Sequence, residues 1–352
     1  MKKIVLTGGG TAGHVTPNIA LVSSLEAEGF EIYYIGSKNG MEKDLVEKEG
    51  LPYYGISSGK LRRYFDLKNF SDPFRVIKGY FEARKLLKEI KPDIVFSKGG
   101  FVTVPVVRAA GSLGIPVVIH EADMTPGLAN KLAMPAAKKI CCSFPETVKS
   151  LPKEKAVYTG CPIRPALYNG DKNKGLEFAG FDGKKPVIMV TGGSLGAANV
   201  NKLVREALPL LLPNFDVIHL CGKGKADETI KDEGYRQFEY VGDEMPDVFA
   251  AADIVISRAG ANAISEISAL AKPNILIPLT LSQSRGDQIL NAASFEKQGF
   301  SYVLEEEKTT PEMLSEAVKH VYENRDKYIE AMKSAENINP VSSITKLLSE
   351  GF

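Results

Sequence analysis

The chain has 352 residues, of which 44% are hydrophobic, and this length suffices for two ordinary domain cores. Its 44 basic and 43 acidic side chains give a formal net charge of +1, which argues against nucleic acid as a partner. No apolar run approaches the roughly 18 to 20 residues that a membrane-spanning helix needs. The four cysteines show neither a CxxC nor a zinc-like spacing, which favours free thiols over disulfides.

Short apolar runs that are typical of buried strands alternate with helical patterns along the chain. This alternation predicts an α/β fold with doubly wound parallel sheets and right-handed crossovers. In the first half we expect strands near 4–7, 32–36, 53–57, 93–97, 116–120, 139–143 and 156–160. In the second half we expect them near 187–191, 216–221, 238–242, 253–257, 274–278 and 302–304.

A domain boundary is predicted where prolines and glycines gather at 160–165, before a polar, glycine-rich stretch at 169–175. We therefore expect one domain at 1–163 and a second at 164–339. The C-terminal region has helical patterns at 311–322, 327–334 and 341–348.

Two glycine-rich segments stand out, TGGGTAGHVTP at 7–17 and TGGSLGAAN at 191–199. Each follows a predicted strand and leads into a helical pattern. Backbone N–H groups and the positive end of a helix can hold a phosphate in such a turn. The sequence thus predicts two phosphate-capable halves with a cleft between them.

The first segment also matches the dinucleotide fingerprint through Gly8, Gly10 and Gly13. A dinucleotide site needs an acidic residue at the end of the second strand, where this chain has Gly36-Ser37. A dehydrogenase is therefore disfavoured. Glycines after a strand can also serve only close packing, but two such segments favour phosphate or sugar contact.

His14 follows the first segment, just before Thr16-Pro17, which suits the first turn of a helix. The positive helix end should keep His14 neutral and able to accept a proton, although a lone histidine is often structural. His120, beside Glu121, is a weaker candidate. His219 and His320 are interpreted as structural.

Two further segments carry polar residues at predicted helix starts. After the strand that ends at Ser257, Gly260 permits a helix start, and Glu266 could bind both hydroxyls of a ribose or simply face solvent. Gln288 and Asn291 follow Asp287 and could read sugar hydroxyls or cap their helix. The chain has no HExxH and no Asp-x-Asp, so helix ends and Arg164 are expected to neutralise a leaving group without a metal.

Six ordered motifs, GGTxGHxxP, KGG[FY], GxPIR, GGSxGA, SRxGAxxxSE and DQxxNA, make the chain resemble the MurG-type glycosyltransferases from residue 4 to about residue 348. The resemblance implies the GT-B fold, with two Rossmann-like domains facing across a cleft and a last helix, 340–352, packing back on the first domain. It also implies transfer of N-acetylglucosamine from its uridine diphosphate ester (UDP-GlcNAc) to the muramyl 4-hydroxyl of undecaprenyl-diphosphate-linked muramyl pentapeptide. That reaction makes lipid II for peptidoglycan, and it is inverting, metal-independent and free of cofactors.

The resemblance also implies roles for individual residues. His14 is the candidate catalytic base, beside a loop of Thr11, Ala12 and Gly13 that faces sugar and acceptor. The acceptor diphosphate is expected at Lys98, Gly99 and Gly100. The remaining candidate substrate contacts are Asp123, Arg164, Gly193, Ser194, Gly260, Ala261, Asn262, Glu266, Gln288 and Asn291.

The chain departs from the family pattern at four places. Ala12 stands where a second glycine is common, Asp287 where a glutamine is common, and Cys161 where the family has asparagine. The His-Glu-Gln-Asn run of the family is His120-Glu121-Ala122-Asp123 here.

Residues 60–91 contain ten basic and four acidic side chains, interleaved with aromatic residues. Such a segment suits an anionic bilayer surface, although a solvated amphipathic helix at 73–90 would show the same pattern. We expect a peripheral protein on the cytoplasmic face of the bacterial membrane. Two alternatives stay open: another enzyme acting on a sugar nucleotide or glycolipid, such as an epimerase, and a non-catalytic nucleotide-sugar-binding module.

Overall fold

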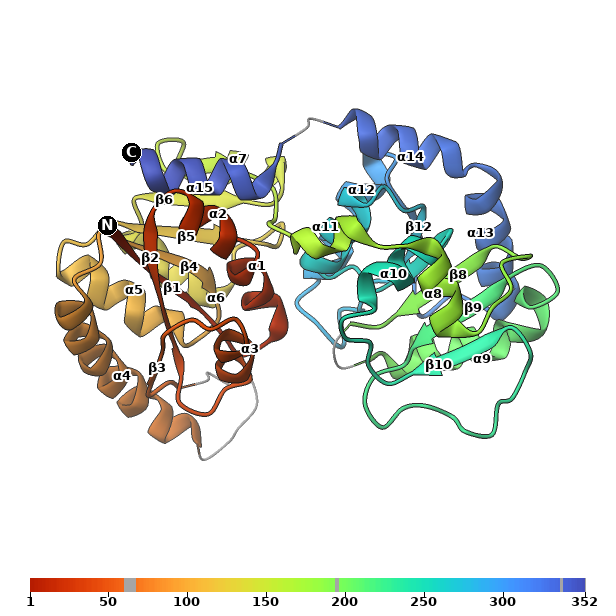
Figure 1. Ribbon diagram of the computed structural model, residues 1–352, viewed down its shortest axis with the longest axis horizontal. Helices are drawn as coiled ribbons and strands as arrows, with labels where there is room; N and C mark the ends of the chain where they lie inside the picture. The colour runs from red at the N-terminus through yellow and green to blue at the C-terminus, as the bar shows by residue number, and fades with distance from the viewer. Residues whose placement is uncertain (60–67, 194–195, 336–337, 352) are drawn as a thin grey trace. The chain divides into compact units, whose positions relative to one another are not determined.

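Two all-parallel sheets carry the fold of the computed structural model, which describes residues 1–59, 68–193, 196–335 and 338–351 (Figure 1). The chain divides into one unit of Met1–Arg164 with Ile338–Phe352 and a second unit of Pro165–Asn337. The α/β fold class predicted from the alternation of strands and helices is confirmed.

The first unit has a seven-stranded sheet in the order β3-β2-β1-β4-β5-β6-β7. Its strands are β1 (Lys2–Gly8), β2 (Phe30–Ser37), β3 (Tyr53–Ile56), β4 (Ile94–Gly99), β5 (Val117–Glu121), β6 (Lys139–Cys142) and β7 (Ala156–Tyr158). Its helices are a 3₁₀ turn at Ala12–His14, α1 (Thr16–Ile19), α2 (Val22–Ala27), α3 (Glu42–Lys48), α4 (Lys68–Ile90), α5 (Thr103–Ser112), α6 (Leu128–Ala133), a 3₁₀ turn at Met134–Ala136, α7 (Pro145–Lys149) and α15 (Pro340–Glu350).

The second unit has a six-stranded sheet in the order β10-β9-β8-β11-β12-β13. Its strands are β8 (Val187–Thr191), β9 (Asp216–Leu220), β10 (Tyr235–Phe238), β11 (Ile254–Ser257), β12 (Asn274–Leu276) and β13 (Tyr302–Val303). Its helices are a 3₁₀ turn at Pro165–Asn169, α8 (Lys172–Ala179), α9 (Ala198–Leu211), α10 (Met245–Ala251), α11 (Ala261–Ala269), α12 (Asp287–Lys297), α13 (Pro311–Glu323) and α14 (Arg325–Ser334).

One expected strand, 238–242, is displaced. The strand is Tyr235–Phe238, which pairs in register with 217–220 of β9. Beyond Phe238, the Gly242 carbonyl accepts the Met245 amide in the turn that enters α10.

Both sheets are buried on two faces, because successive strand residues point to opposite sides and helices cover each side. In β1, Val5 joins one core cluster, whereas Ile4 and Leu6 join the other. In β8, Ile188 and Met189 are likewise divided between two clusters.

The C-terminal helix α15 belongs to the first unit, where it contacts α2 (Figure 1). Asn339 caps its first turn by accepting a hydrogen bond from the Ser342 amide at 3.0 Å. Ile344 and Leu348 are buried in the same cluster as Ile4. Burial of two such side chains contributes roughly 1.5–3 kcal/mol each toward holding this helix on the first unit.

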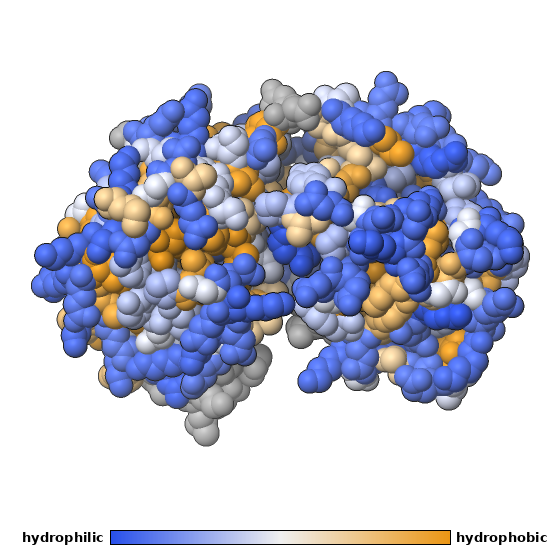
Figure 2. Space-filling view, viewed as in Figure 1, coloured by the Kyte–Doolittle hydropathy of each residue, from blue (hydrophilic) through white to orange (hydrophobic). Residues whose placement is uncertain are grey.

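The surface seen in Figure 2 is largely hydrophilic, with apolar side chains in scattered groups. Within the described ranges, no helix is both long enough and apolar enough to cross a membrane.

Candidate active site

The first glycine loop leaves β1 at Gly8 and packs directly on the loop after β4. The β1–β4 register shifts between Thr7 and Gly8, so that Gly8 pairs with Gly99. Gly100 has a φ of +94°, and a Cβ atom there would lie 2.2 Å from the Gly9 carbonyl oxygen. Only glycine permits both this conformation and this approach. The structure therefore joins two of the predicted acceptor segments.

Glu42, at the start of α3, lies beneath the same loop and is fully buried. Its carboxylate accepts hydrogen bonds from the Gly10 amide at 3.2 Å, from the Ser37 amide at 3.0 Å and from the Ser37 hydroxyl. A Cβ atom at Gly9 or Gly40 would collide with this carboxylate. The Gly10 amide, which the sequence predicts to bind a phosphate, thus donates to the Glu42 carboxylate of the protein itself. This corrects the expectation that all amides of the first glycine loop are available to a phosphate.

His14 ends the 3₁₀ turn that follows the loop, and Ala12 and Gly13 form the rest of that turn. Its Nδ1 lies 3.0 Å from the hydroxyl oxygen of the exposed Thr11. A Cβ atom built on Gly99 would lie 3.6 Å from His14 Cδ2, so the imidazole and the second glycine loop are neighbours.

The protein keeps His14 neutral. Burial, followed by the charge of Lys98, lowers the pKa of His14 to about 4, while a Gly9 backbone hydrogen bond and the Glu42 charge act in the opposite direction. This direction agrees with the expected neutral imidazole, but its causes are burial and the Lys98 charge and not a helix end. The following helix α1 has only four residues.

Lys98 points inward, unlike the acceptor contact that the family resemblance implies. Only 1% of the residue is exposed, and Nζ lies 2.8 Å from His120 Nδ1 and 3.6 Å from Cys161 Sγ. His120 Nε2 lies 2.9 Å from the Gly160 carbonyl oxygen, to which it must donate, so Nδ1 accepts from the ammonium. Burial and the Lys98 charge hold the pKa of His120 well below its usual range.

Glu121, to which the sequence motifs assign no role of its own, organises the next loop. Its carboxylate accepts from the Asp123 amide at 3.1 Å, the Gly127 amide at 3.1 Å and the Asn130 side chain at 2.8 Å. Asn130 also donates to the His120 carbonyl, and a Cβ on Gly99 would lie 3.4 Å from its Oδ1. Asn130 and Glu42 are thus site neighbours that the motifs did not identify.

The second glycine loop leads from β8 into α9. Gly196 has a φ of +66°, and a Cβ there would lie 2.0 Å from the Cys221 carbonyl oxygen. Its own carbonyl accepts a hydrogen bond from Lys225 Nζ at 3.1 Å. Ser194, predicted to contact the donor, lies outside the described residues.

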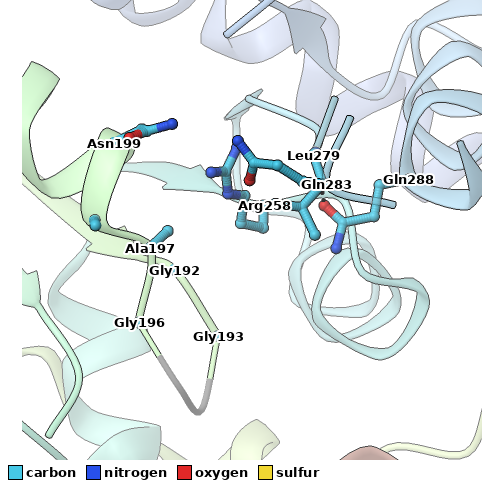
Figure 3. A pocket seen from close by; sticks show the side chains of 10 residues that line it. Gly192, Gly193, Gly196, Ala197, Asn199, Arg258, Leu279, Gln283 and Gln288 are labelled. Atoms are coloured by element: carbon cyan, nitrogen blue, oxygen red, sulfur yellow. Dashed lines mark hydrogen bonds between the residues drawn. The ribbon is translucent and has the colours of Figure 1, made fainter. Parts of the chain in front are cut away.

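A pocket of about 440 Å³ opens beside this loop, entirely within the second unit (Figure 3). In Figure 3 the glycine turn and the start of α9 lie on one side, and Gln283 and Gln288 on the other. Its lining residues are Gly192, Gly193, Gly196, Ala197, Ala198, Asn199, Arg258, Leu279, Gln283 and Gln288. The N-cap residue of α9, Ala197, makes no side-chain capping bond, so the helix start offers amides and a positive end to this space.

The predicted sugar-reading residues take different positions. Gln288 lines the pocket, and its Oε1 accepts the Leu279 amide at 3.1 Å. Asn291 is fully buried, and its side chain donates to the Ala259 carbonyl at 3.1 Å. The implied sugar contact by Asn291 is thus replaced here by a role in ordering the turn before α11.

Gly260 is the N-cap residue of α11, and a Cβ there would lie 4.0 Å from Gln288 Nε2. Ala261 and Asn262 form the first turn of this helix, and Glu266 lies partly buried in the next turn. Arg164 is the last residue of the first unit's main segment, whereas every residue lining the pocket belongs to the second unit.

The other histidines and the cysteines have structural surroundings. His219 is buried between the Tyr235 hydroxyl and the Asn201 side chain, at 2.8 and 3.0 Å. His320 is exposed, with its ring against Tyr302. All four cysteines are free thiols. In the described ranges no three His, Cys, Asp or Glu residues are placed to hold a metal ion.

Comparison with known proteins agrees with this arrangement. Residues 4–142 match the glycosyltransferase family 28 N-terminal domain, and residues 187–348 match the glycosyltransferase family 28 C-terminal domain. Relatives in Lachnoclostridium phytofermentans and Lachnospira eligens are 62% and 60% identical, each over 99% of both chains. Both are named UDP-N-acetylglucosamine--N-acetylmuramyl-(pentapeptide) pyrophosphoryl-undecaprenol N-acetylglucosamine transferase.

Among solved structures, Acinetobacter baumannii MurG superposes with a TM-score of 0.76 at 26% identity and covers 100% of both chains. With two matching domain models and relatives of such identity along its whole length, the chain belongs to glycosyltransferase family 28.

Proposed function

We propose that this protein transfers N-acetylglucosamine from UDP-GlcNAc to the muramyl 4-hydroxyl of undecaprenyl-diphosphate-linked muramyl pentapeptide, the step that makes lipid II for peptidoglycan. The observation that carries the proposal is 62% identity along 99% of the chain to a transferase named for this reaction. The transfer inverts the anomeric carbon and uses neither a metal nor a cofactor.

The donor binds in the second-unit pocket. Amides at the start of α9 and in the Gly192–Gly193 turn face the diphosphate, which a helix N-terminus attracts. Gln288 has its Oε1 fixed by the Leu279 amide, so its Nε2 group is left to read the sugar. Ser194, Arg164 and the α11 start support the diphosphate, and Glu266 takes the ribose hydroxyls.

The acceptor binds against the paired glycine loops of the first unit. A neutral His14 is able to take the proton of the muramyl hydroxyl as that oxygen attacks the anomeric carbon. Bond formation at this carbon and departure of uridine diphosphate occur on opposite faces, which gives inversion. Helix starts that face the diphosphate stabilise the negative charge on the leaving group.

The direct test mixes the protein with UDP-GlcNAc and a short-chain muramyl-lipid acceptor and follows uridine diphosphate release and the disaccharide product. We expect release only when both substrates are present. A new sugar isomer from the donor alone would identify an epimerase instead. Donor binding without release in the presence of acceptor would identify a binding module.

We also propose that the segment 60–91 holds the protein on an anionic membrane. Residues 60–67 lie outside the described residues, so the support comes from α4. Phe74, Ile77 and Phe81 are 76%, 56% and 62% exposed. Phe74, Lys78, Phe81, Lys85 and Lys88 follow a spacing of three or four residues, which puts them along one side of the helix. Basic residues flanking exposed aromatic ones suit the interface of anionic lipids, and we place the protein on the cytoplasmic face of the membrane.

A further inference from the structure

Three consecutive glutamates follow β13, and only the middle one points inward. The Glu305 side chain is exposed and pairs with Lys308 at 2.7 Å. Glu307 is exposed as well. The Glu306 side chain, by contrast, is only 7% exposed.

Glu306 forms a buried ion pair with Arg258, one of the residues that line the pocket. Its Oε1 lies 2.5 Å from Arg258 Nη2. Arg258 Nη1 donates to the carbonyls of Ile277 and Pro278, at 3.0 and 3.3 Å. A buried guanidinium whose carboxylate is removed keeps its desolvation cost without compensation, so Arg258 depends on Glu306.

These contacts tie together the ends of three neighbouring strands. Arg258 follows β11, Ile277 follows β12, and Glu306 lies three residues beyond β13. The Arg258 side chain thus bonds both to the backbone that continues β12 and to the Glu306 carboxylate that follows β13. The carboxyl edge of the sheet is fixed at the point where the pocket opens.

The segment 278–288, which we call the pocket wall, begins at this fixed point. It supplies Leu279, Gln283 and Gln288 to the lining (Figure 3). Gln283 Nε2 donates to Glu306 Oε2 at 3.3 Å, so Glu306 holds the middle of the wall as well as its start. Gln288 in turn is tied to the wall by the Leu279 amide.

We propose that Glu306 is a positioning residue that sets the selectivity of the pocket for the sugar of a nucleotide sugar. It fixes the pocket wall and, through the wall, the amide of Gln288. Because Glu306 neutralises the Arg258 guanidinium, the pocket wall selects the sugar through side-chain amides held in fixed positions and not through an unpaired positive charge. The inference rests on the proposed function, in which this pocket binds the donor.

The test compares Glu306→Gln with Glu307→Gln, a matched change at the adjacent exposed carboxylate. Dissociation constants are measured for UDP-GlcNAc and for uridine diphosphate, which lacks the sugar. We expect Glu306→Gln to weaken UDP-GlcNAc binding by roughly 10-fold, because a displaced amide loses its hydrogen bond, and to change uridine diphosphate binding by less than about 2-fold. Glu307→Gln should resemble wild type in both.

Two measurements keep the test decisive. Amide hydrogen exchange of residues 279–288 should be faster in Glu306→Gln and unchanged in Glu307→Gln. If Glu306→Gln fails to fold, Glu306→Asp keeps the charge beside Arg258 but is too short to reach both partners, and it should show the same selective loss. Equal dissociation constants for UDP-GlcNAc in wild type and the Glu306 variants would overturn the inference. If wild type itself fails to bind UDP-GlcNAc, the result contradicts the proposed function and not only the role of Glu306.

Discussion

The Glu42 carboxylate accepts a hydrogen bond from the Gly10 amide at 3.2 Å, so the first glycine loop is braced by an internal anion. The second loop has no such acid among its described contacts; a lysine, Lys225, bonds its Gly196 carbonyl. Two loops with similar sequences therefore differ in electrostatic character. This difference agrees with the proposal that the acceptor hydroxyl binds at the first loop and the donor diphosphate at the second.

Removal of the Glu42 charge should disturb acceptor use more than donor use. In Glu42→Gln the side-chain amide would place a donor against the Gly10 N–H, which costs about 1–3 kcal/mol for a buried unpaired group. We expect lower thermal stability and a kcat/KM for acceptor that falls roughly 10-fold at constant donor KM. Glu47→Gln, at an exposed site on the same helix, is the control. Identical kinetics in the two variants would contradict the bracing role.

His14→Ala should lower turnover by roughly 100-fold or more, because the acceptor hydroxyl loses its base. Donor affinity should remain within about 2-fold, since every residue lining the donor pocket belongs to the other unit. His320→Ala, at an exposed histidine, should leave turnover unchanged. Wild-type turnover in His14→Ala would remove His14 from the chemistry.

Lys98→Met should raise the pKa of His14, because the buried ammonium is one of the two causes that lower it to about 4. Methionine has a similar length and no charge, so the site keeps most of its packing. Nuclear magnetic resonance titration of the His14 ring in both proteins measures the shift. Lys131→Met, at an exposed lysine on α6, should have no effect. An unchanged His14 titration in Lys98→Met would show that the Lys98 charge is not felt there.

His219 should make the protein less stable in mild acid. Burial, followed by the charge of Arg205, lowers the pKa of His219 to about 3, whereas an unfolded histidine titrates near 6.5. As pH falls below about 6.5, the unfolded chain takes a proton that folded His219 refuses, so stability is lost by up to about 1.4 kcal/mol per pH unit. Above about pH 6.5, the contribution of His219 to the free energy of unfolding does not change with pH.

His219→Gln retains hydrogen-bonding groups but cannot take this proton. Its unfolding free energy, measured in urea between pH 7 and pH 5, should therefore fall less steeply than that of wild type. Equal slopes in the two proteins would mean that His219 titrates normally in the folded state.

Replacement of Phe74, Ile77 and Phe81 by serine should release the protein from vesicles that contain anionic lipid at low salt. Three exposed apolar side chains leave the interface, while the basic residues of α4 remain. A variant with serine at Leu210 and Tyr240, two exposed apolar residues of the second unit, is the control and should stay bound. Equal retention of both variants would assign membrane binding to another surface.

The alternation of strands and helices was readable in the sequence because buried parallel strands are short, apolar and regularly spaced. The glycine loops could also be predicted from the sequence. Close backbone approaches, as at Gly100 and Gly196, leave no room for any other residue. The displaced strand at Tyr235–Phe238 shows where this fails: the β9 residues that fix its position lie elsewhere in the sequence, so its bounds have no local sign.

The long-range partners of charged residues could not be predicted. Glu42 contacts an amide 32 positions away, and nothing in its helix separates it from exposed glutamates nearby. The glycines at 36 and 40, which give its side chain room, are the only local sign. Lys98 beside two glycines suggests an exposed phosphate ligand, yet its partner is His120 on the next strand. The inward turn of Glu306 alone among three glutamates is likewise a property of the folded sheet edge.

A crystal structure with UDP-GlcNAc bound tests the proposed donor site most directly. We predict that the pyrophosphate contacts the amides at the start of α9, beside Gly196 and Ala197, and that the sugar reaches Gln288. A pyrophosphate bound away from both the second glycine loop and the start of α11 would contradict this donor site.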